Sequence, residues 1–213
     1  MDEFAARAEL VALVQRLDQL GLNVNSSGNL SVRLADEVLV TPSGIPANDT
    51  TADDLVLLDL DGKPAHRDQR RPTSEWQLHT ALYRRRPDVY AIVHTHSPEA
   101  TAAAAVGVDV PAVHYVVARF GSASLRCARY STYGTAELAA EVVDTLGDTG
   151  MACLMANHGA VCVGGSLVAA AALALDVEWF CGVHRRAVAQ GPPVVLTDVE
   201  VARVADLFAG YGQ

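Results

Sequence analysis

The chain has 213 residues, half of them hydrophobic, and a formal net charge of −9. This length suits one α/β domain with a single core, so we expect residues 1–213 to form one domain. The composition excludes a disordered or fibrous protein, and the acidic balance argues against a nucleic-acid or anionic-membrane partner, because clustered Lys and Arg bind such partners.

The first third of the chain predicts one helix followed by a small meander of strands. Apolar residues recur at helical spacing over residues 2–20, and Gly21 follows as a stop signal. Short apolar runs then predict strands at 30–34, 38–41 and 55–60, separated by turn-forming residues.

In the remainder, helical and strand patterns interleave. Ser74 and Gln77 stand at capping-box spacing at the start of a predicted helix. The helices are expected at 74–86, from 97 onward, at 135–146, at 166–190 and at 197–209, and the strands at 89–93, 112–118, 151–155 and 160–163. Some strand runs also adjoin as hairpins, so we predict an α/β fold with a mixed or largely antiparallel sheet flanked by helices.

The cysteines and the apolar segments indicate the compartment. The four cysteines show no Cys-x-x-Cys spacing, and two of them lie inside apolar runs, which favours reduced core thiols. The N-terminus lacks a long apolar core, and no later stretch reaches about 18 uncharged apolar residues. We therefore expect a cytoplasmic protein with no membrane partner.

Three histidines follow apolar strand runs. His94 and His96 are two apart at the end of one predicted strand, so their side chains share a face and can meet one ion, although two surface histidines would show the same spacing. His158 follows another strand and precedes Gly159, which leaves room for a ligand or a neighbouring backbone to approach. Three histidines without a closing cysteine are typical of a catalytic zinc site. We expect structural roles for the other histidines, which are His66, His79, His114 and His184.

Small polar residues gather in three segments that predict an anion site. Glu75 stands in the first turn of its predicted helix, where an acid is commonly found, and the adjoining segment 72–76 offers hydroxyls and free amides. The loops 27–29 and 41–44 are each ordinary turns when taken singly. Together with Thr73 and Ser74 they predict a phosphate cradle without Lys or Arg.

An ordered set of seven motifs closely resembles the class II aldolase and adducin family. The resemblance extends from the first helix to Tyr211. The motifs are Ser27-Gly-Asn29, Thr41-Pro-Ser-Gly-Ile-Pro46, Arg71-Pro-Thr-Ser-Glu-Trp76, Val93-His-Thr-His96, His114-Tyr115, Tyr130-Ser-Thr-Tyr-Gly134 and Asn157-His-Gly159.

The resemblance implies a three-layer α/β/α sandwich with a central, mainly antiparallel sheet, assembled as a cyclic homotetramer with active sites at subunit interfaces. Carried over by position, the metal ligands would be His94, His96, His158 and Glu75, with Zn²⁺ or another divalent metal as cofactor. Glu75 would also be the catalytic base. The substrate phosphate would bind at Asn29, Ser43, Gly44, Thr73 and Ser74. Tyr115 would handle the aldehyde oxygen in a neighbouring subunit's site, and Tyr133 and Tyr211 would line the aldehyde side.

The activity implied by the resemblance is cleavage of a ketose 1-phosphate, either L-fuculose 1-phosphate or a related deoxy-sugar phosphate. The products would be dihydroxyacetone phosphate and a short aldehyde, formed by retro-aldol chemistry through a metal-stabilised enediolate. A dehydratase or decarboxylase of the same family is the alternative. A 4-epimerase is disfavoured because such enzymes carry an aspartate in place of Glu75, and a non-catalytic adducin-like domain need not keep the base and all three histidines. Tyr133, Ser43 and the short tail depart from the fuculose-phosphate enzymes, so the sugar could differ.

Overall fold

A seven-stranded sheet forms the centre of the computed structural model, which describes residues 2–209. The strand order is β3-β2-β1-β4-β9-β8-β7. The strands are β1 (Asn29–Leu34), β2 (Glu37–Val40), β3 (Val56–Asp59), β4 (Ala91–Thr95), β7 (Cys127–Ala128), β8 (Ala152–Met155) and β9 (Gly159–Gly164). Among these described strands only the β7–β8 pair is parallel. The prediction of a mainly antiparallel sheet is confirmed.

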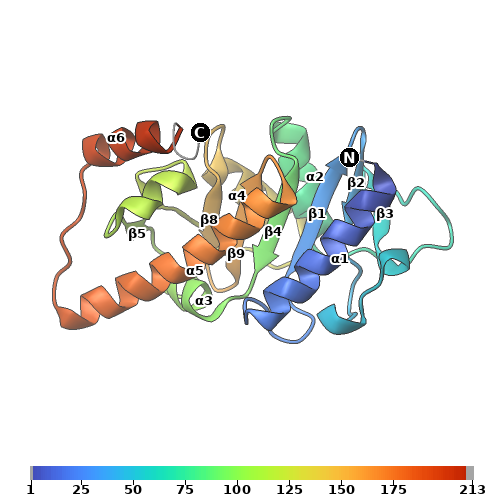
Figure 1. Ribbon diagram of the computed structural model, residues 1–213, viewed down its shortest axis with the longest axis horizontal. Coiled ribbons are helices and arrows are strands. Elements are labelled where there is room, and N and C mark those ends of the chain that lie inside the picture. The colour runs from blue at the N-terminus through green and yellow to red at the C-terminus, as the bar shows by residue number, and fades with distance from the viewer. Residues whose placement is uncertain (1, 210–213) are drawn as a thin grey trace.

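Helices cover both faces of this sheet and complete three layers (Figure 1). One face packs against α1 (Glu3–Gln19), α3 (Pro98–Ala104) and α5 (Leu167–Gln190). The opposite face packs against α2 (Trp76–Arg85) and α4 (Ala136–Leu146). Side chains alternate along each strand and therefore contribute to two separate apolar cores, one on each face of the sheet. This is the arrangement of the expected α/β/α sandwich.

Shorter elements lie around this frame. A two-stranded sheet lies beside this frame, and α6 (Asp198–Ala209) contacts the 3₁₀ helix η3, which in turn contacts α5. The remaining elements are η1 (Ala47–Asp49), η2 (Ala52–Asp54), β5 (Val110–Pro111), η3 (Tyr115–Phe120) and β6 (Ser124–Leu125).

The helix α5 is the most apolar long element of the described chain. By length and composition alone it could cross a membrane, but 50% of its apolar window is buried inside the fold. Its buried side chains pack on β4 and β9. Burial against the sheet is thus sufficient to explain its apolar composition.

The strand predicted at 112–118 is wrong. The chain pairs only over β5 and then turns into η3. His114 caps this turn, because its ring accepts a hydrogen bond from the Val116 amide, and Gly121 ends it in the left-handed conformation. A side chain that bonds its own backbone competes with strand pairing, and the apolar run is buried by a tight helix instead.

The start of α2 also differs from the prediction. The helix begins at Trp76, one residue after Glu75, and the expected capping box of Ser74 and Gln77 does not form. The Thr73 hydroxyl accepts from the Glu75 amide in its place. Glu75 therefore stands at the N-cap position with a non-helical backbone, and not within the first turn. A capping box does form at the start of α6, between Thr197 and Glu200.

Candidate functional site

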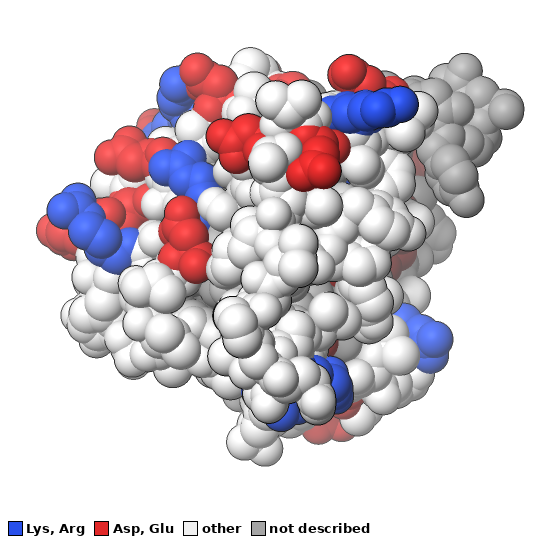
Figure 2. Space-filling model, turned by 90° about the vertical axis from the view of Figure 1, so that its left-hand side faces the viewer, with Lys and Arg blue, Asp and Glu red and all other residues white. Residues whose placement is uncertain are grey.

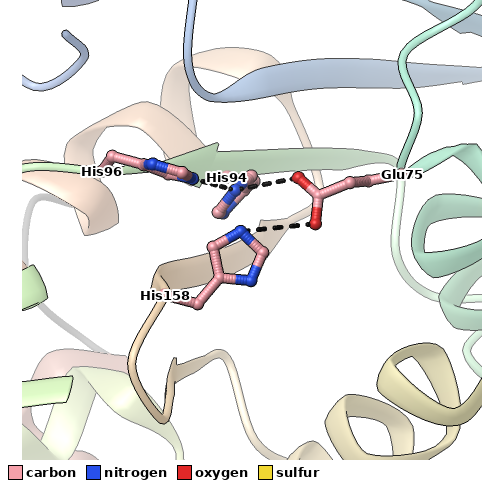
Figure 3. Close-up of side chains that lie close together, drawn as sticks. All are labelled: Glu75, His94, His96 and His158. Atoms are coloured by element: carbon pink, nitrogen blue, oxygen red, sulfur yellow. Dashed lines mark hydrogen bonds and ion pairs between the residues drawn. The ribbon is translucent and has the colours of Figure 1, made fainter. Parts of the chain in front are cut away.

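Four predicted metal ligands converge from three separate segments (Figure 3). His94 lies in β4 and His96 just after it, His158 lies in the turn between β8 and β9, and Glu75 precedes α2. One ligand atom from each residue can be chosen so that all four lie within 4.8 Å of one another. The antiparallel pairing of β4 with β9 brings the two histidine segments together, since Thr95 is paired with Ala160.

The distances within this cluster are those of groups that face a common point. Glu75 Oε2 is 3.1 Å from His94 Nε2, and Glu75 Oε1 is 3.5 Å from His158 Nε2. His94 Nε2 and His96 Nε2 are 2.9 Å apart. The three rings contact one another edge to face, with centroids 4.7 to 4.9 Å apart.

The donor set fits a divalent cation. His94 Nδ1 lies 2.9 Å from the Ala160 carbonyl, which only accepts, so this nitrogen carries the hydrogen and Nε2 presents a lone pair. A second imidazole nitrogen, from His96, faces that lone pair. Glu75 Oε1 is buried and, among the described residues, has no hydrogen-bond partner. A cation would satisfy all of these acceptors at once, and three imidazoles with a carboxylate are ligands that zinc accepts.

The electrostatics of the cluster favour an ionised carboxylate and keep two of the three imidazoles neutral. Burial alone would raise the pKa of Glu75, but the imidazoles of His94 and His158 and the Asn29 amide hold it well below its usual range. Burial, together with the neighbouring imidazoles, lowers the pKa of both His96 and His158 to about 4. Burial opposes protonation of His94 too, yet the adjacent Glu75 carboxylate outweighs it and raises the His94 pKa.

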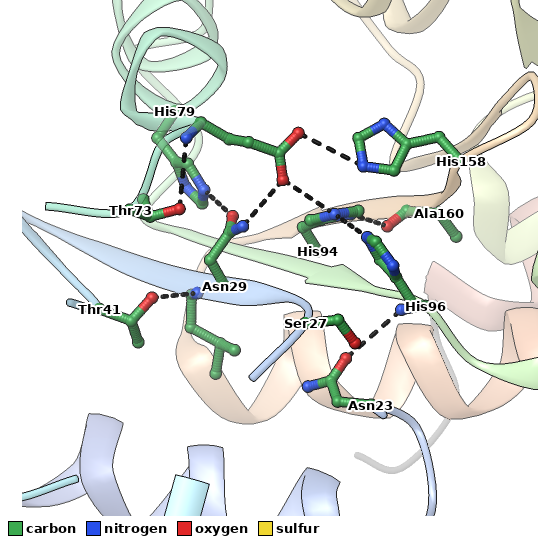
Figure 4. Close-up of polar contacts among 12 residues, drawn as sticks. Asn23, Ser27, Asn29, Thr41, Thr73, His79, His94, His96, His158 and Ala160 are labelled. Atoms are coloured by element: carbon green, nitrogen blue, oxygen red, sulfur yellow. Dashed lines mark hydrogen bonds and ion pairs between the residues drawn. The ribbon is translucent and has the colours of Figure 1, made fainter. Parts of the chain in front are cut away.

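Residues outside the cluster hold its members in place (Figure 4). Asn29 Nδ2 donates to Glu75 Oε2 at 2.9 Å, and Asn23 Oδ1 accepts from the His96 amide at 3.3 Å. The Asn29 amide carries two hydrogens, so this contact leaves one for a bound ligand. The asparagine that was predicted to bind phosphate therefore also holds the predicted base.

A pocket of about 350 Å³ opens beside Glu75, His96 and His158. All five residues predicted to bind phosphate line it, and so does Tyr133. Its lining includes no Lys or Arg among the described residues, and hydroxyl, amide and glycine groups predominate on one side. That side is formed by Ser26, Ser27, Gly28, Asn29, Ser43, Gly44, Thr73 and Ser74. Such a lining can bind an anion through neutral donors.

The segment 130–134 closes another side of this pocket. Tyr130, Ser131 and Tyr133 line it, and the two tyrosines are largely exposed. A Cβ at Gly134, where φ is +73°, would lie 2.8 Å from the Ser74 carbonyl oxygen, so glycine permits the segment to approach the start of α2. Sequence reasoning gave no role to Tyr130, Ser131 or Asn157, although all three belong to motifs that carried the resemblance.

Two predicted site residues do not join the pocket in this chain. Tyr115 lies on η3, half-exposed, with its ring beside those of His114 and Phe208, and does not line the pocket. Tyr211 lies outside the described residues.

Comparisons with known proteins agree with this geometry. The model of the class II aldolase and adducin N-terminal domain matches residues 8–184. A 5-methylthioribulose-1-phosphate/5-deoxyribulose-1-phosphate aldolase of Rhodospirillum rubrum is 40% identical over 98% of this chain and 93% of its own length. An L-fuculose phosphate aldolase of Escherichia coli is 38% identical over 96% of this chain and 94% of its own. The solved structure of an L-fuculose 1-phosphate aldolase superposes with a TM-score of 0.92 at 34% identity, covering 96% of both chains.

Proposed function

The chain belongs to the class II aldolase and adducin family and is an aldehyde-lyase of that family. We propose that it cleaves a ketose 1-phosphate to dihydroxyacetone phosphate and a short aldehyde. The observation that carries the proposal is the convergence of three imidazoles on a buried glutamate at the edge of a pocket lined with neutral donors. L-Fuculose 1-phosphate and 5-deoxy- or 5-methylthioribulose 1-phosphate are the candidate substrates, because the relatives are named for them.

We propose that the cofactor is zinc, held by His94, His96, His158 and, before substrate binds, Glu75. When bound, the cation supplies Lewis acidity that stabilises negative charge developing on the ketose carbonyl oxygen. The two histidines with lowered pKa stay neutral at physiological pH and so keep their lone pairs available to it.

Glu75 is proposed as the group that moves the proton at carbon. In cleavage, a base takes the proton of the hydroxyl beside the breaking bond, and the bond's electron pair remains with the ketose fragment. Glu75, after taking up a proton from solvent, delivers it to that carbon; in the synthetic direction the ionised carboxylate removes the proton from the same carbon. Glu75 lines the pocket, and Oε1 suits this task because it has no hydrogen-bond partner among the described residues, while Asn29 holds Oε2.

The phosphate group is proposed to bind at Asn29, Ser43, Gly44, Thr73 and Ser74, which line one side of the pocket. The start of α2 adds the positive end of a helix dipole. These neutral donors explain how a chain with a net charge of −9 can bind an anionic sugar.

The aldehyde side is proposed to be completed by Tyr133 and Tyr211 and by Tyr115 from a neighbouring subunit of a homotetramer. Tyr115 is half-exposed and does not line its own chain's pocket, as such a role requires. Figure 2 shows a broad surface without charged residues in the middle of this side, between charged residues along its upper part and a few more near its lower edge. Light scattering should give a tetramer, and Tyr115→Phe should lower kcat without changing the assembly.

The compartment proposed for this enzyme is the cytoplasm. All four cysteines are free thiols, three of them buried and Cys127 half-buried. Unpaired thiols are typical of proteins in a reducing compartment.

A substrate panel tests the proposed reaction. Zinc-loaded enzyme is incubated with L-fuculose 1-phosphate, 5-deoxyribulose 1-phosphate and 5-methylthioribulose 1-phosphate, and dihydroxyacetone phosphate is measured by its enzymatic reduction. Glu75→Gln, which keeps the shape but cannot take a proton, should retain metal and lose turnover. Release of water or carbon dioxide without dihydroxyacetone phosphate would instead identify a dehydratase or decarboxylase.

A further inference from the structure

A chain of four buried polar side chains leads away from Glu75 into the sheet. His79 lies one helical turn after Glu75 on α2 and is fully buried. Its Nε2 is 2.6 Å from Asn29 Oδ1, and its Nδ1 is 2.6 Å from Ser31 Oγ (Figure 4). Ser31 Oγ is in turn 2.8 Å from Tyr83 Oη. Since Asn29 donates to Glu75, the contacts are continuous from Tyr83 to the carboxylate.

The carboxylate fixes the direction of every hydrogen bond in this chain. Ionised Glu75 only accepts, so Asn29 must present its NH₂ to it and its oxygen to His79. That oxygen requires a donor, which places the His79 hydrogen on Nε2. Burial lowers the pKa of His79 to about 3, so the ring is neutral and Nδ1 accepts from the Ser31 hydroxyl. The Ser31 oxygen then accepts from Tyr83.

This order matters because an asparagine amide is nearly symmetric in shape. Turned by 180°, the amide of Asn29 would place its oxygen against the Glu75 carboxylate and its NH₂ against His79. The contact between the amide oxygen and the carboxylate would be repulsive. At His79, the amide NH₂ would face the Nε2–H, and two donors cannot form a hydrogen bond. The Nε2–H tautomer of His79 is therefore compatible with only one orientation of the Asn29 amide, which is the orientation that donates to Glu75.

We propose that His79 is a positioning residue that acts through Asn29 to fix the Glu75 carboxylate beside the metal cluster. The effect on catalysis rests on the proposed function, whereas the arrangement of hydrogens does not. Removing the Nε2 donor leaves a buried amide oxygen unpaired and frees Asn29 to turn. The carboxylate then loses the hydrogen bond that holds Oε2 in place, so its orientation is no longer fixed.

A matched pair of neutral variants isolates this donor. The amide nitrogen of Gln reaches the place of a histidine Nε2, whereas that of Asn stops near the place of Nδ1. His79→Gln should keep the hydrogen bond to Asn29 and retain kcat. His79→Asn should lose the bond and lower kcat roughly ten- to a hundredfold, with a much smaller change in KM. His184→Asn, on the distant helix α5, is the control and should leave both constants unchanged.

Outcomes of the kinetic experiment separate positioning from simple stabilisation. A purely structural role would lower the melting temperature of both His79 variants and leave their kcat values alike. Equal kcat for the Gln and Asn variants, both folded and fully metal-loaded, would overturn the proposal.

A second measurement needs neither metal nor turnover. The metal-free protein is labelled with ¹⁵N-histidine, and the ring nitrogens of His79 are assigned by their loss in His79→Gln. We expect a neutral ring with its hydrogen on Nε2 at neutral pH. A hydrogen on Nδ1 would overturn the proposal, even if the substrate panel succeeded. If the panel failed, this spectrum would still decide how His79 faces Asn29.

Discussion

Gly159, the first residue of β9, lies against the backbone of Thr95, the residue between His94 and His96. A Cβ at this position would be 2.3 Å from the Thr95 carbonyl oxygen and 3.2 Å from His96 Cδ2, whereas ordinary contacts begin near 3.4 Å. Gly159→Ala therefore requires β4 and β9 to separate by about 1 Å at the cluster. Overpacking of this kind costs roughly 1–3 kcal/mol of stability.

The same displacement should damage the metal site more than the fold. Metal–ligand distances tolerate only about 0.2 Å of error, and the alanine would push His158 away from His94 and His96. We expect zinc affinity to fall roughly ten- to a hundredfold, as for changes in the groups that orient metal ligands. Isothermal titration of the metal-free protein with zinc measures the affinity, and urea unfolding measures the stability.

Gly165→Ala is the matched control for this experiment. It lies just beyond the same strand, and a Cβ there would have nothing within 4 Å. Its zinc affinity should equal that of the unaltered protein. If folded Gly159→Ala bound zinc as tightly as Gly165→Ala, the close approach of the two strands would not be what assembles the site.

Three further results are expected. His96→Ala should remove tightly bound zinc and activity together, as metal analysis and the aldolase assay would show; full metal loading would contradict the ligand assignment. Because the pKa of His79 is about 3 when folded but near 6.5 when unfolded, the unfolded chain binds the extra proton as pH falls. The free energy of unfolding therefore falls as the pH is lowered from 7.5 to 5. Measured by urea unfolding, this fall should be about 2 kcal/mol smaller for His79→Gln than for the unaltered protein. Equal falls would refute the neutral state given to His79. Glu178 accepts from the amides of Glu99 and Ala100 at the start of α3, and Glu178→Ala should therefore lower the free energy of unfolding by about 2 kcal/mol, with zinc affinity unchanged.

The parts of the fold that depend on local patterns could be predicted from the sequence. Apolar periodicity identified the helices on both faces of the sheet, the strand that contains His94 and the two strands that flank His158, because burial imposes that periodicity directly. Gly159 was expected to leave room for a ligand or for a neighbouring backbone, and the backbone of Thr95 lies against it. The sequence reasoning placed the end of the first histidine strand early, and the strand in fact includes His94.

What could not be predicted depends on single side chains that reach across the fold. His79 was expected to be merely structural, because nothing in a helical pattern shows that its ring meets Asn29, which is 50 residues away in the chain. Likewise, the Thr73 hydroxyl accepts a hydrogen bond from the Glu75 amide in place of the predicted capping box, and Glu75 lies outside the helix. The ring of His114 turned an apolar run into η3 by the same kind of local competition.

The register between β1 and β4 connects the metal cluster to the buried polar chain. Asn29 is paired directly with His94, so both side chains project from the same face of the sheet and meet Glu75 from two directions. Two residues further along β1, on that same face, Ser31 meets His79. A slip of one residue in this pairing would turn His94 toward the opposite core and leave Asn29 without a partner. The neighbouring residues Leu30 and Val93 are paired with each other, and both are buried in that opposite core. The packing of Leu30 and Val93, which are not part of the site, therefore determines which polar groups surround Glu75.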